Sequence, residues 1–99
     1  MSTELTNKQI SHLKGLGQKL DPVLVIGRNG VTESFVKGLN EALDQHELVK
    51  VRFGDFKEQK KTLAPELAAK AACQLIQRVG NVAVYFRQQA APERRKIAI

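Results

Sequence analysis

The residues best suited to chemistry lie between positions 23 and 35, in the stretch VLVIGRNGVTESF. Two glycines, Gly27 and Gly30, stand there three positions apart, and glycine allows a sharp turn and the close approach of another main chain. Between them, Arg28 carries a charged fork of donors that matches phosphate oxygens. Asn29 tolerates the left-handed conformation and can hydrogen-bond a sugar or a base edge. These four residues, here called the GxxG loop, predict an anion-binding corner suited to a sugar–phosphate backbone.

The flanking residues place the GxxG loop at a joint between a strand and a helix. The run 23–26, VLVI, lacks polar alternation and predicts a strand covered on both faces. Thr32 is a suitable N-cap for a helix that runs to about position 45 or 46, with Glu33 in its first turn. The free amides and the dipole of such a turn favour an anion. Glycines at both ends of a short loop are also ordinary turn chemistry, so the loop alone leaves both readings open.

Two further segments have clear periodic patterns. Residues 5–20 predict a helix that opens with a capping box, in which Thr6 pairs with Gln9. Residues 47–53, ELVKVRF, alternate as a strand with one buried and one wetter face. We expect the first helix to pack at an end of the sheet or on its other side.

The C-terminal third predicts a hairpin and a tail. Residues 73–87 read as two strands that turn at Gly80-Asn81, a two-residue hairpin signal. The tail, about 90–99, is expected to be extended or mobile. The predicted order is α-β-α-β-α-β-β in one domain, 1–99, of the α/β (α+β) class. Strands separated by helices favour parallel pairing of the first two strands, and the hairpin adds an antiparallel edge to a four-stranded mixed sheet.

The segment 54–72, GDFKEQKKTLAPELAAKAA, predicts a third helix that contains a proline. Pro65 would fit the first position of a helix. A helix starting near Phe56 would instead carry it inside, at a cost of about 3 kcal/mol. The helix therefore either starts at Pro65 or is longer and kinked, and we favour the longer form.

The composition indicates a small, folded, basic protein. The 99 residues are 42% apolar, and 16 Lys and Arg against 10 Asp and Glu give a net charge of +6. The sequence pI of about 9.8 raises the expectation of a nucleic-acid partner or, less often, an anionic membrane surface. No apolar run approaches the roughly 20 residues of a membrane span, and no signal peptide is recognisable. One cysteine cannot form an internal disulfide, so we expect a cytoplasmic protein.

The sequence offers no recognisable catalytic or metal-binding group of residues. His12, His46 and Cys73 have no metal-ligand spacing, and no nucleophile with a base and an orienting group can be assigned. The loop also lacks a GxGxxG pattern and the lysine of a nucleotide-binding P-loop. We therefore expect no enzymatic activity, no metal and no cofactor.

From the GxxG loop outward, the sequence resembles a known family. KQISHLKGLGQKLDPVLVIGRNGVTESFVKGLNEAL followed by HELVKVRF is similar to the CRM domain (chloroplast RNA splicing and ribosome maturation), especially its stand-alone bacterial YhbY-like members. RVGNVAVYFR and the ending PERRKIAI also resemble such proteins. The resemblance implies a fold similar to the C-terminal domain of the third bacterial initiation factor, a long third helix, and RNA binding through the loop at 27–30. For bacterial members it implies association with precursors of the large ribosomal subunit.

Other basic residues could extend an RNA site at the loop. Lys50 and Arg52 share one strand face. Arg78, Tyr85 and Arg87 of the last two strands could lie on the same face, where the tyrosine could stack a base while the cations contact phosphates. A solvated face, or one covered by the first helix, explains the same pattern. Lysines of the first helix could flank the loop, and the basic tail could act as a flexible arm or simply fray. Beyond the GxxG loop, the predicted RNA-binding residues are Lys14, Lys50, Arg52, Arg78, Tyr85, Arg87, Arg94, Arg95 and Lys96.

We hypothesise a monomeric, non-enzymatic protein that binds folded or single-stranded large-subunit ribosomal RNA or a pre-ribosomal particle and assists subunit assembly. The alternative is a protein-interaction module that docks on a ribosomal protein or assembly factor, with its charge merely solubilising the chain. An enzyme acting on a phosphorylated small molecule is supported by the anion-binding corner alone.

Overall fold

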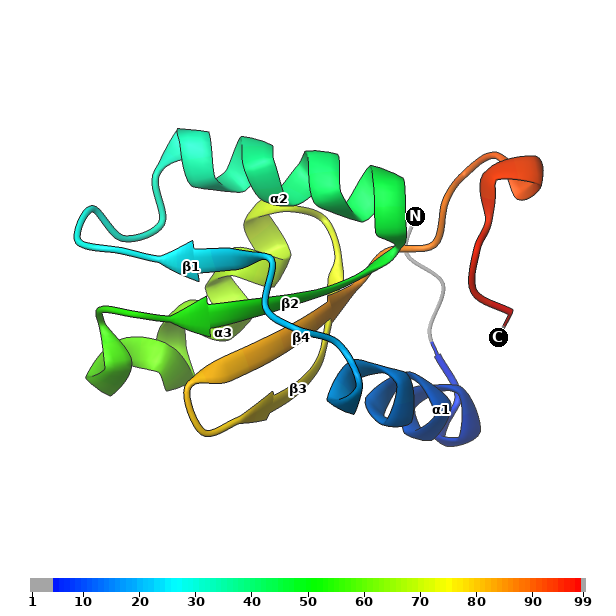
Figure 1. The fold of residues 1–99 in the computed structure, drawn as a ribbon, viewed down its shortest axis with the longest axis horizontal. Helices are drawn as coiled ribbons and strands as arrows, with labels where there is room; N and C mark the ends of the chain where they lie inside the picture. Colours follow the sequence, from blue (N-terminus) through cyan, green and yellow to red (C-terminus); the bar gives the residue numbers. More distant parts are fainter. Residues whose placement is uncertain (1–4, 99) are drawn as a thin grey trace.

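The computed structural model describes residues 5–98, and its elements follow the predicted order α-β-α-β-α-β-β (Figure 1). Short 3₁₀ turns at Lys57–Gln59 and Pro92–Arg94 accompany the main elements. The helices and strands are α1 (Asn7–Gln18), β1 (Leu24–Ile26), α2 (Glu33–His46), β2 (Leu48–Phe53), α3 (Lys60–Lys70), β3 (Gln74–Val79) and β4 (Val82–Phe86).

The four strands form one mixed sheet in the order β1-β2-β4-β3. β1 runs parallel to β2, because α2 carries the chain back to the same end of the sheet. β4 is antiparallel to both β2 and β3. The predicted parallel pair and the antiparallel hairpin are confirmed, and Gly80 turns the hairpin with a positive φ of 57°.

The helices cover the two faces of the sheet unequally. α2 and α3 pack together on one face, here called the two-helix face, over the larger part of the core. α1 packs on the opposite face, the α1 face, where Leu13 meets Leu48, Val84 and Phe86. The first helix therefore lies on the other side of the sheet, which was one of the two places expected for it. Because α1 is short and sits near one end, the rest of its face has no helix over it (Figure 1).

Local signals fixed the start of two helices. Thr6 and Gln9 form the predicted capping box, with Gln9 N donating to Thr6 Oγ1 over 3.1 Å and Thr6 N donating to Gln9 Oε1 over 2.9 Å. Thr32 caps α2 as predicted, since its Oγ1 accepts a hydrogen bond from the Phe35 amide over 3.1 Å. α2 ends at His46, within the predicted range.

Pro65 lies inside α3, so the helix does not start there and the longer form is confirmed. Proline has no amide hydrogen, and the carbonyl of Lys61 therefore lacks its usual intrahelical partner. Both residues are exposed, which lets water take that place. The proline therefore removes a hydrogen bond only on the solvent side of the helix, where the loss of stability is smallest.

Two expectations about chain ends and edges were wrong. β1 is an edge strand rather than a strand covered on both faces: Val23 is 58% exposed and Val25 is 47% exposed, because α1 does not reach this edge. The tail is not an extended segment either. It folds back onto Glu47, whose carboxylate accepts hydrogen bonds from the amides of Gln89, Lys96 and Ile97. Within residues 5–98, no helix has the length and apolar character needed to cross a membrane.

Candidate nucleic-acid interface

The GxxG loop projects from the carboxyl end of β1, at the left of Figure 1. The Gly30 amide donates to the Gly27 carbonyl over 3.0 Å, which closes a tight turn around Arg28 and Asn29. Gly30 has a φ of +71°, in the region that favours glycine. Gly27, Arg28 and Asn29 are exposed, so the corner is open to a ligand.

The electrostatics of the loop come from Arg28 and the start of α2. Backbone amides in the first turn of a helix have no intrahelical acceptor, and Thr32 satisfies only that of Phe35. Among residues 5–98, Arg28 makes no side-chain hydrogen bond or ion pair, so its whole donor fork faces solvent. Two carboxylates, Glu33 and Asp55, stand on the flanking segments, and neither pairs with Arg28. The corner is therefore cationic, and no described residue neutralises its arginine.

Phe56 adjoins the loop and was missed by the sequence analysis. Its ring lies so close to Gly30 that a Cβ placed on that glycine would be 3.3 Å from Phe56 Cε2. Phe56 is 40% exposed and has a φ of 56°, which is unusual for a bulky residue. A phenylalanine after a strand ordinarily suggests core packing, so the sequence carried no signal for this exposed position.

Lys50 and Arg52 share the α1 face of the sheet, as predicted. Arg52 lies between Val25 of β1 and Val82 of β4, which are its partners in the two ladders. Lys50 pairs with Val84. Within the described part of the chain, neither side chain makes a hydrogen bond or an ion pair. They therefore interrupt a mainly valine surface with unpaired positive charge.

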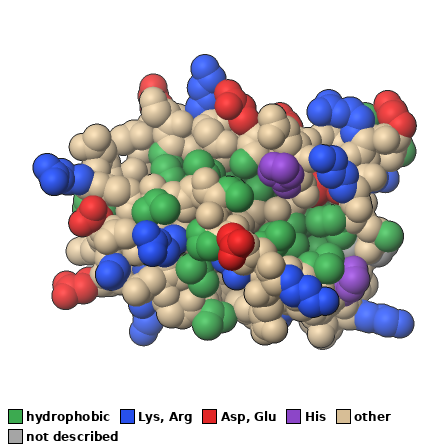
Figure 2. All heavy atoms as spheres, viewed as in Figure 1, with side chains coloured by type: hydrophobic (Ala, Val, Ile, Leu, Met, Phe, Trp, Pro, Cys, Tyr) green, Lys and Arg blue, Asp and Glu red, His purple; other side chains and the backbone are tan. Residues whose placement is uncertain are grey.

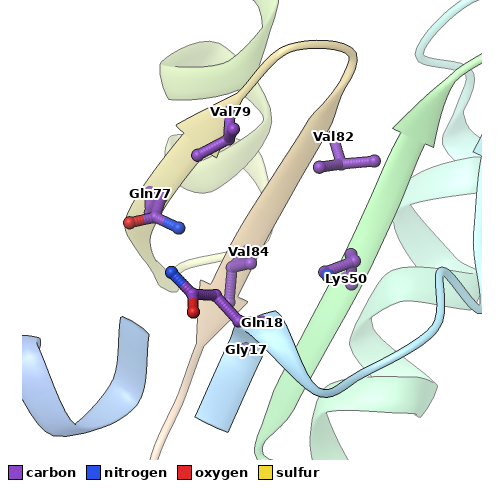
Figure 3. Close-up of a pocket in the computed structure, with 7 residues that line it drawn as sticks. All are labelled: Gly17, Gln18, Lys50, Gln77, Val79, Val82 and Val84. Carbon is purple, nitrogen blue, oxygen red and sulfur yellow. The ribbon is translucent and has the colours of Figure 1, made fainter. Parts of the chain in front are cut away.

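A groove of about 310 Å³ lies where α1 ends and this surface begins (Figure 3). The end of α1 forms one wall and side chains of three strands form the floor. In Figure 2 hydrophobic side chains reach the surface across the middle of the molecule, with Lys and Arg side chains around them and acidic ones among them. The residues lining the groove are Gly17, Gln18, Lys50, Gln77, Val79, Val82 and Val84.

Tyr85 does not lie on the face of Lys50 and Arg52, and the prediction that it does is wrong. Its ladder partner on β2 is Val49, which places its ring on the two-helix face, where it is 0% exposed. The hydroxyl donates to the Ala64 carbonyl over 2.9 Å, and burial raises the pKa of Tyr85 above its ordinary value. Tyr85 is a core residue that cannot stack a base in this fold.

Arg87 also belongs to the two-helix side, so its predicted placement is wrong as well. Its guanidinium donates to Asn40 Oδ1 over 2.6 Å, to the Ala71 carbonyl over 2.7 Å and to Asp44 Oδ1 over 3.1 Å. It also donates to the Asn40 carbonyl over 3.1 Å. These bonds join α2 to the end of α3, and they leave the side chain little capacity for a phosphate.

Arg78 is the third hairpin residue placed on the wrong face. It pairs with Ala83 of β4, a residue of the two-helix core, and therefore points to that side. A bulge between Leu75 and Gln77 shifts the register of β3. Such a shift cannot be recognised from the alternation of side chains in the sequence. The Arg78 guanidinium donates to the Gly80 carbonyl at the hairpin turn over 3.2 Å.

Lys14 and the basic tail lie away from the loop. Figure 1 shows the loop at one end of the longest axis, which measures 37 Å, and the tail at the other. Lys14 is exposed on α1, which packs on the far part of the sheet, so the first helix does not flank the loop as expected. The tail residues Arg94, Arg95 and Lys96 are exposed in a segment that folds back onto Glu47, and Arg95 Nε donates to the Gln89 carbonyl over 2.8 Å.

Three further reactive side chains of the described residues, Cys73, His12 and His46, lie apart from the loop. Burial raises the pKa of the Cys73 thiol to about 11, although the charge of Arg87 opposes the shift, so the thiol is a poor nucleophile. His12 and His46 are exposed. Among the described residues, no three His, Cys, Asp or Glu side chains gather closely enough to hold a metal ion.

Comparisons with known proteins find relatives along nearly the whole chain. The family model described as the CRS1 / YhbY (CRM) domain matches residues 5–87. The chain is 34% identical over 91 residues to a probable RNA-binding protein of Pseudomonas aeruginosa, with 91% of this chain and 88% of that protein covered. It is 35% identical over 86 residues to an RNA-binding protein of Haemophilus influenzae, with coverages of 86% and 87%. A hypothetical protein of Staphylococcus aureus, solved in solution, matches with a TM-score of 0.77 at 30% identity, over 96% of this chain and 100% of that one.

Proposed function

The chain belongs to the CRS1 / YhbY (CRM) domain family, as its resemblance predicted, and we propose that it binds RNA without catalysing a reaction, through the GxxG loop with Lys50 and Arg52. Family membership and the names of its relatives support RNA as the partner. One observation supports the loop as the contact: Arg28 is exposed at the start of a helix and has no partner among the described residues. Phosphate groups are the natural occupants of such a site.

The chemistry of the site predicts how RNA would bind. Phosphates would contact Arg28 and the first-turn amides of α2, while Lys50 and Arg52 extend the positive charge along the sheet. Each phosphate neutralised by a cation releases counterions, so the affinity falls steeply as salt rises. Because phosphate contacts carry no sequence information, these groups alone would hold RNA without selecting a base.

The identity of the RNA rests on the family resemblance. We propose large-subunit ribosomal RNA, or a pre-ribosomal particle, as the partner, and assistance of subunit assembly as the role, carried out by a monomer in the cytoplasm. Crosslinking the protein in cells and sequencing the attached RNA tests this choice. Reads concentrated in large-subunit RNA and its precursors are expected, and reads spread over messenger RNA would contradict it.

The loop assignment is tested with a double variant, Arg28→Asp with Asn29→Asp, measured by fluorescence anisotropy on a large-subunit RNA fragment. We expect an affinity loss of about tenfold or more at roughly 0.1 M salt and a shallower salt dependence. Arg94→Asp is the matched control, because Arg94 is an exposed arginine at the opposite end of the molecule. Circular dichroism and urea unfolding verify that both variants fold.

Unchanged affinity of the folded double variant would show that the loop is not the contact. An equal loss in Arg94→Asp would move the interface to the tail. If the protein stays on ribosomal particles after RNase treatment and at high salt, it docks on a protein, and the RNA-binding function is wrong for this site.

A further inference from the structure

Two exposed apolar features, one at the GxxG loop and one across the α1 face, are not explained by phosphate binding. Phe56 exposes 40% of its surface while touching Gly30. On the α1 face, Val25 and Val79 are 47% and 57% exposed. Phosphates gain nothing from aromatic and aliphatic carbon, so a ligand that uses these surfaces must also present flat, apolar groups.

The exposed valines and the cations form one surface. In the ladders, Val25 and Val82 lie on either side of Arg52, and Val79 is the partner of Val82 on the next strand. Adjacent strands are about 4.8 Å apart, so these side chains form a row across the sheet. Here this row is called the valine row. It runs beside the groove of about 310 Å³ and ends at β1, whose next residues are the GxxG loop.

The combination of cationic and apolar side chains on this surface indicates which ligand it binds. Unpaired cations call for an anionic ligand, and the exposed ring and the valine row call for planar apolar faces. RNA supplies both only where its bases are unpaired, because a duplex stacks the base faces inside and offers the protein phosphates and hydroxyls. Proteins that bind single strands use the same combination, aromatic or apolar platforms with a positive groove.

We propose that this site takes a single-stranded RNA segment, with phosphates at the GxxG loop, Lys50 and Arg52, and with unpaired bases against Phe56 and the valine row. The proposal rests on the RNA-binding function proposed above and specifies its substrate. It assigns the aromatic contact to Phe56, the role that the sequence analysis gave to Tyr85. It also gives Gly30 a second function, since a Cβ there would stand 3.3 Å from Phe56 Cε2 and would push the ring away from the loop.

The test compares one 12-nucleotide RNA, free and annealed to its complement, at the same salt concentration. We expect the unaltered protein to bind the single strand about tenfold or more tightly than the duplex, a ratio typical of the loss or gain of a base–aromatic stack. Phe56→Leu keeps an apolar side chain and removes the ring, so it should lose about fivefold or more of its single-strand affinity and none of its duplex affinity. Phe56→Tyr is the matched control and should bind as the unaltered protein does.

A second variant, Val79→Asn, probes the valine row independently, because Val79 is exposed and its replacement leaves the core intact. Val79→Asn should also weaken binding to the single strand and leave the affinity for the duplex unchanged. Equal affinity for the two RNA forms, or full single-strand affinity in both folded variants, would overturn the single-strand proposal. If the loop double variant still lost affinity for both RNA forms, the RNA-binding function of the loop would hold although the single-strand proposal had failed. If Val79→Asn weakened binding to ribosomal particles but not to naked RNA, a protein would be the occupant of the valine row.

Discussion

The two ends of this molecule both carry arginines but use them in different ways. At the tail end, Arg87 donates to acceptors on Asn40, Ala71 and Asp44, and Arg95 donates to a carbonyl of the tail. At the loop end, Arg28 has no hydrogen bond or ion pair with any described residue. A cation already bound to carbonyls and carboxylates gains little from a phosphate, so Arg28 is available to an anionic ligand and Arg87 is not.

The same contrast holds for the carboxylates. Glu47 is 1% exposed, and its two oxygens accept three amides of the tail, from Gln89 over 2.7 Å, Lys96 over 2.6 Å and Ile97 over 2.9 Å. This arrangement, here called the Glu47 latch, makes the tail part of the fold. The loop end has no comparable internal network within residues 5–98, and its exposed groups remain for a ligand. The Glu47 latch therefore stabilises the tail end, while the loop end keeps the exposed groups that the proposed RNA site uses.

Glu47→Ala should have the largest effect of the variants that separate stability at the tail end from binding at the loop end. Hydrogen bonds to a charged group contribute about 1.5–3 kcal/mol each, and losing the latch frees the whole tail, so we expect the free energy of unfolding to fall by about 3 kcal/mol. RNA affinity, measured below the unfolding transition, should stay within about twofold, because the latch lies at the opposite end from the loop. Urea unfolding and anisotropy measure the two quantities on the same sample.

Glu47→Gly is the control for backbone strain, since Glu47 has a φ of 63°. Glycine relieves that strain but also removes the latch, so it should be less destabilising than alanine and still weaker than the unaltered protein. An RNA affinity that fell with stability in both variants would mean that the tail end contributes to binding.

Acid should weaken the same latch to a smaller extent. Burial alone would raise the pKa of Glu47, but the amides of Gln89, Lys96 and Ile97 and the charge of Arg95 outweigh it and lower the pKa from its ordinary 4.5. Because the folded pKa lies below the unfolded one, the carboxylate's contribution to stability is fully present above about pH 4.5 and is lost as the pH falls through the folded pKa. Urea unfolding between about pH 7 and pH 3 should therefore show the advantage of the unaltered protein over Glu47→Gln shrinking in acid. An advantage that stayed constant over this range would show that the latch does not depend on charge.

Much of the fold followed from local signals that act within a few residues. The capping box at Thr6, the N-cap at Thr32 and the Gly80 turn are each satisfied by neighbours in sequence, so the sequence alone could place them. The alternation of β2 likewise assigned Lys50 and Arg52 to one face correctly. Such signals also located the GxxG loop, because a strand end, two glycines and an N-cap follow one another directly.

The errors came from contacts between distant segments. β4 reads VAVYF and is apolar on both faces, so its sequence does not say which face Tyr85 takes, and only the pairing of Val49 with Tyr85 decides it. Glu47 looked like an ordinary polar residue before a strand, yet its partner at Gln89 lies 42 positions away. Phe56 is 40% exposed at a left-handed position with a φ of 56°, which its sequence neighbours do not indicate. The GxxG loop, Lys50 and Arg52 could therefore be predicted from the sequence. Phe56 could not, and Tyr85 and Arg87, which contribute to the tertiary structure, could not be told apart from exposed binding residues.

The two loop glycines give the finest test, because the structure assigns them different roles. Gly30 has a φ of +71°, and its missing Cβ would meet Phe56 at 3.3 Å, so Gly30→Ala should lower the free energy of unfolding by about 1–2 kcal/mol. Gly27 lies outside the left-handed region, and a Cβ there meets no atom within 4 Å. Gly27→Ala should therefore change stability by less than about 0.5 kcal/mol.

The effect of Gly27→Ala on RNA affinity tests whether RNA contacts the main chain of the loop. If an RNA backbone presses against the main chain of the loop, the added methyl group stands in its way, and affinity should fall by about threefold or more although the free protein is unaltered. Anisotropy at constant salt measures this directly, with Gly15→Ala as control, because Gly15 also has open space around its missing Cβ but lies on α1. Full affinity in Gly27→Ala would mean that RNA reaches only the Arg28 side chain, and that the main chain of the loop is a turn and not a contact.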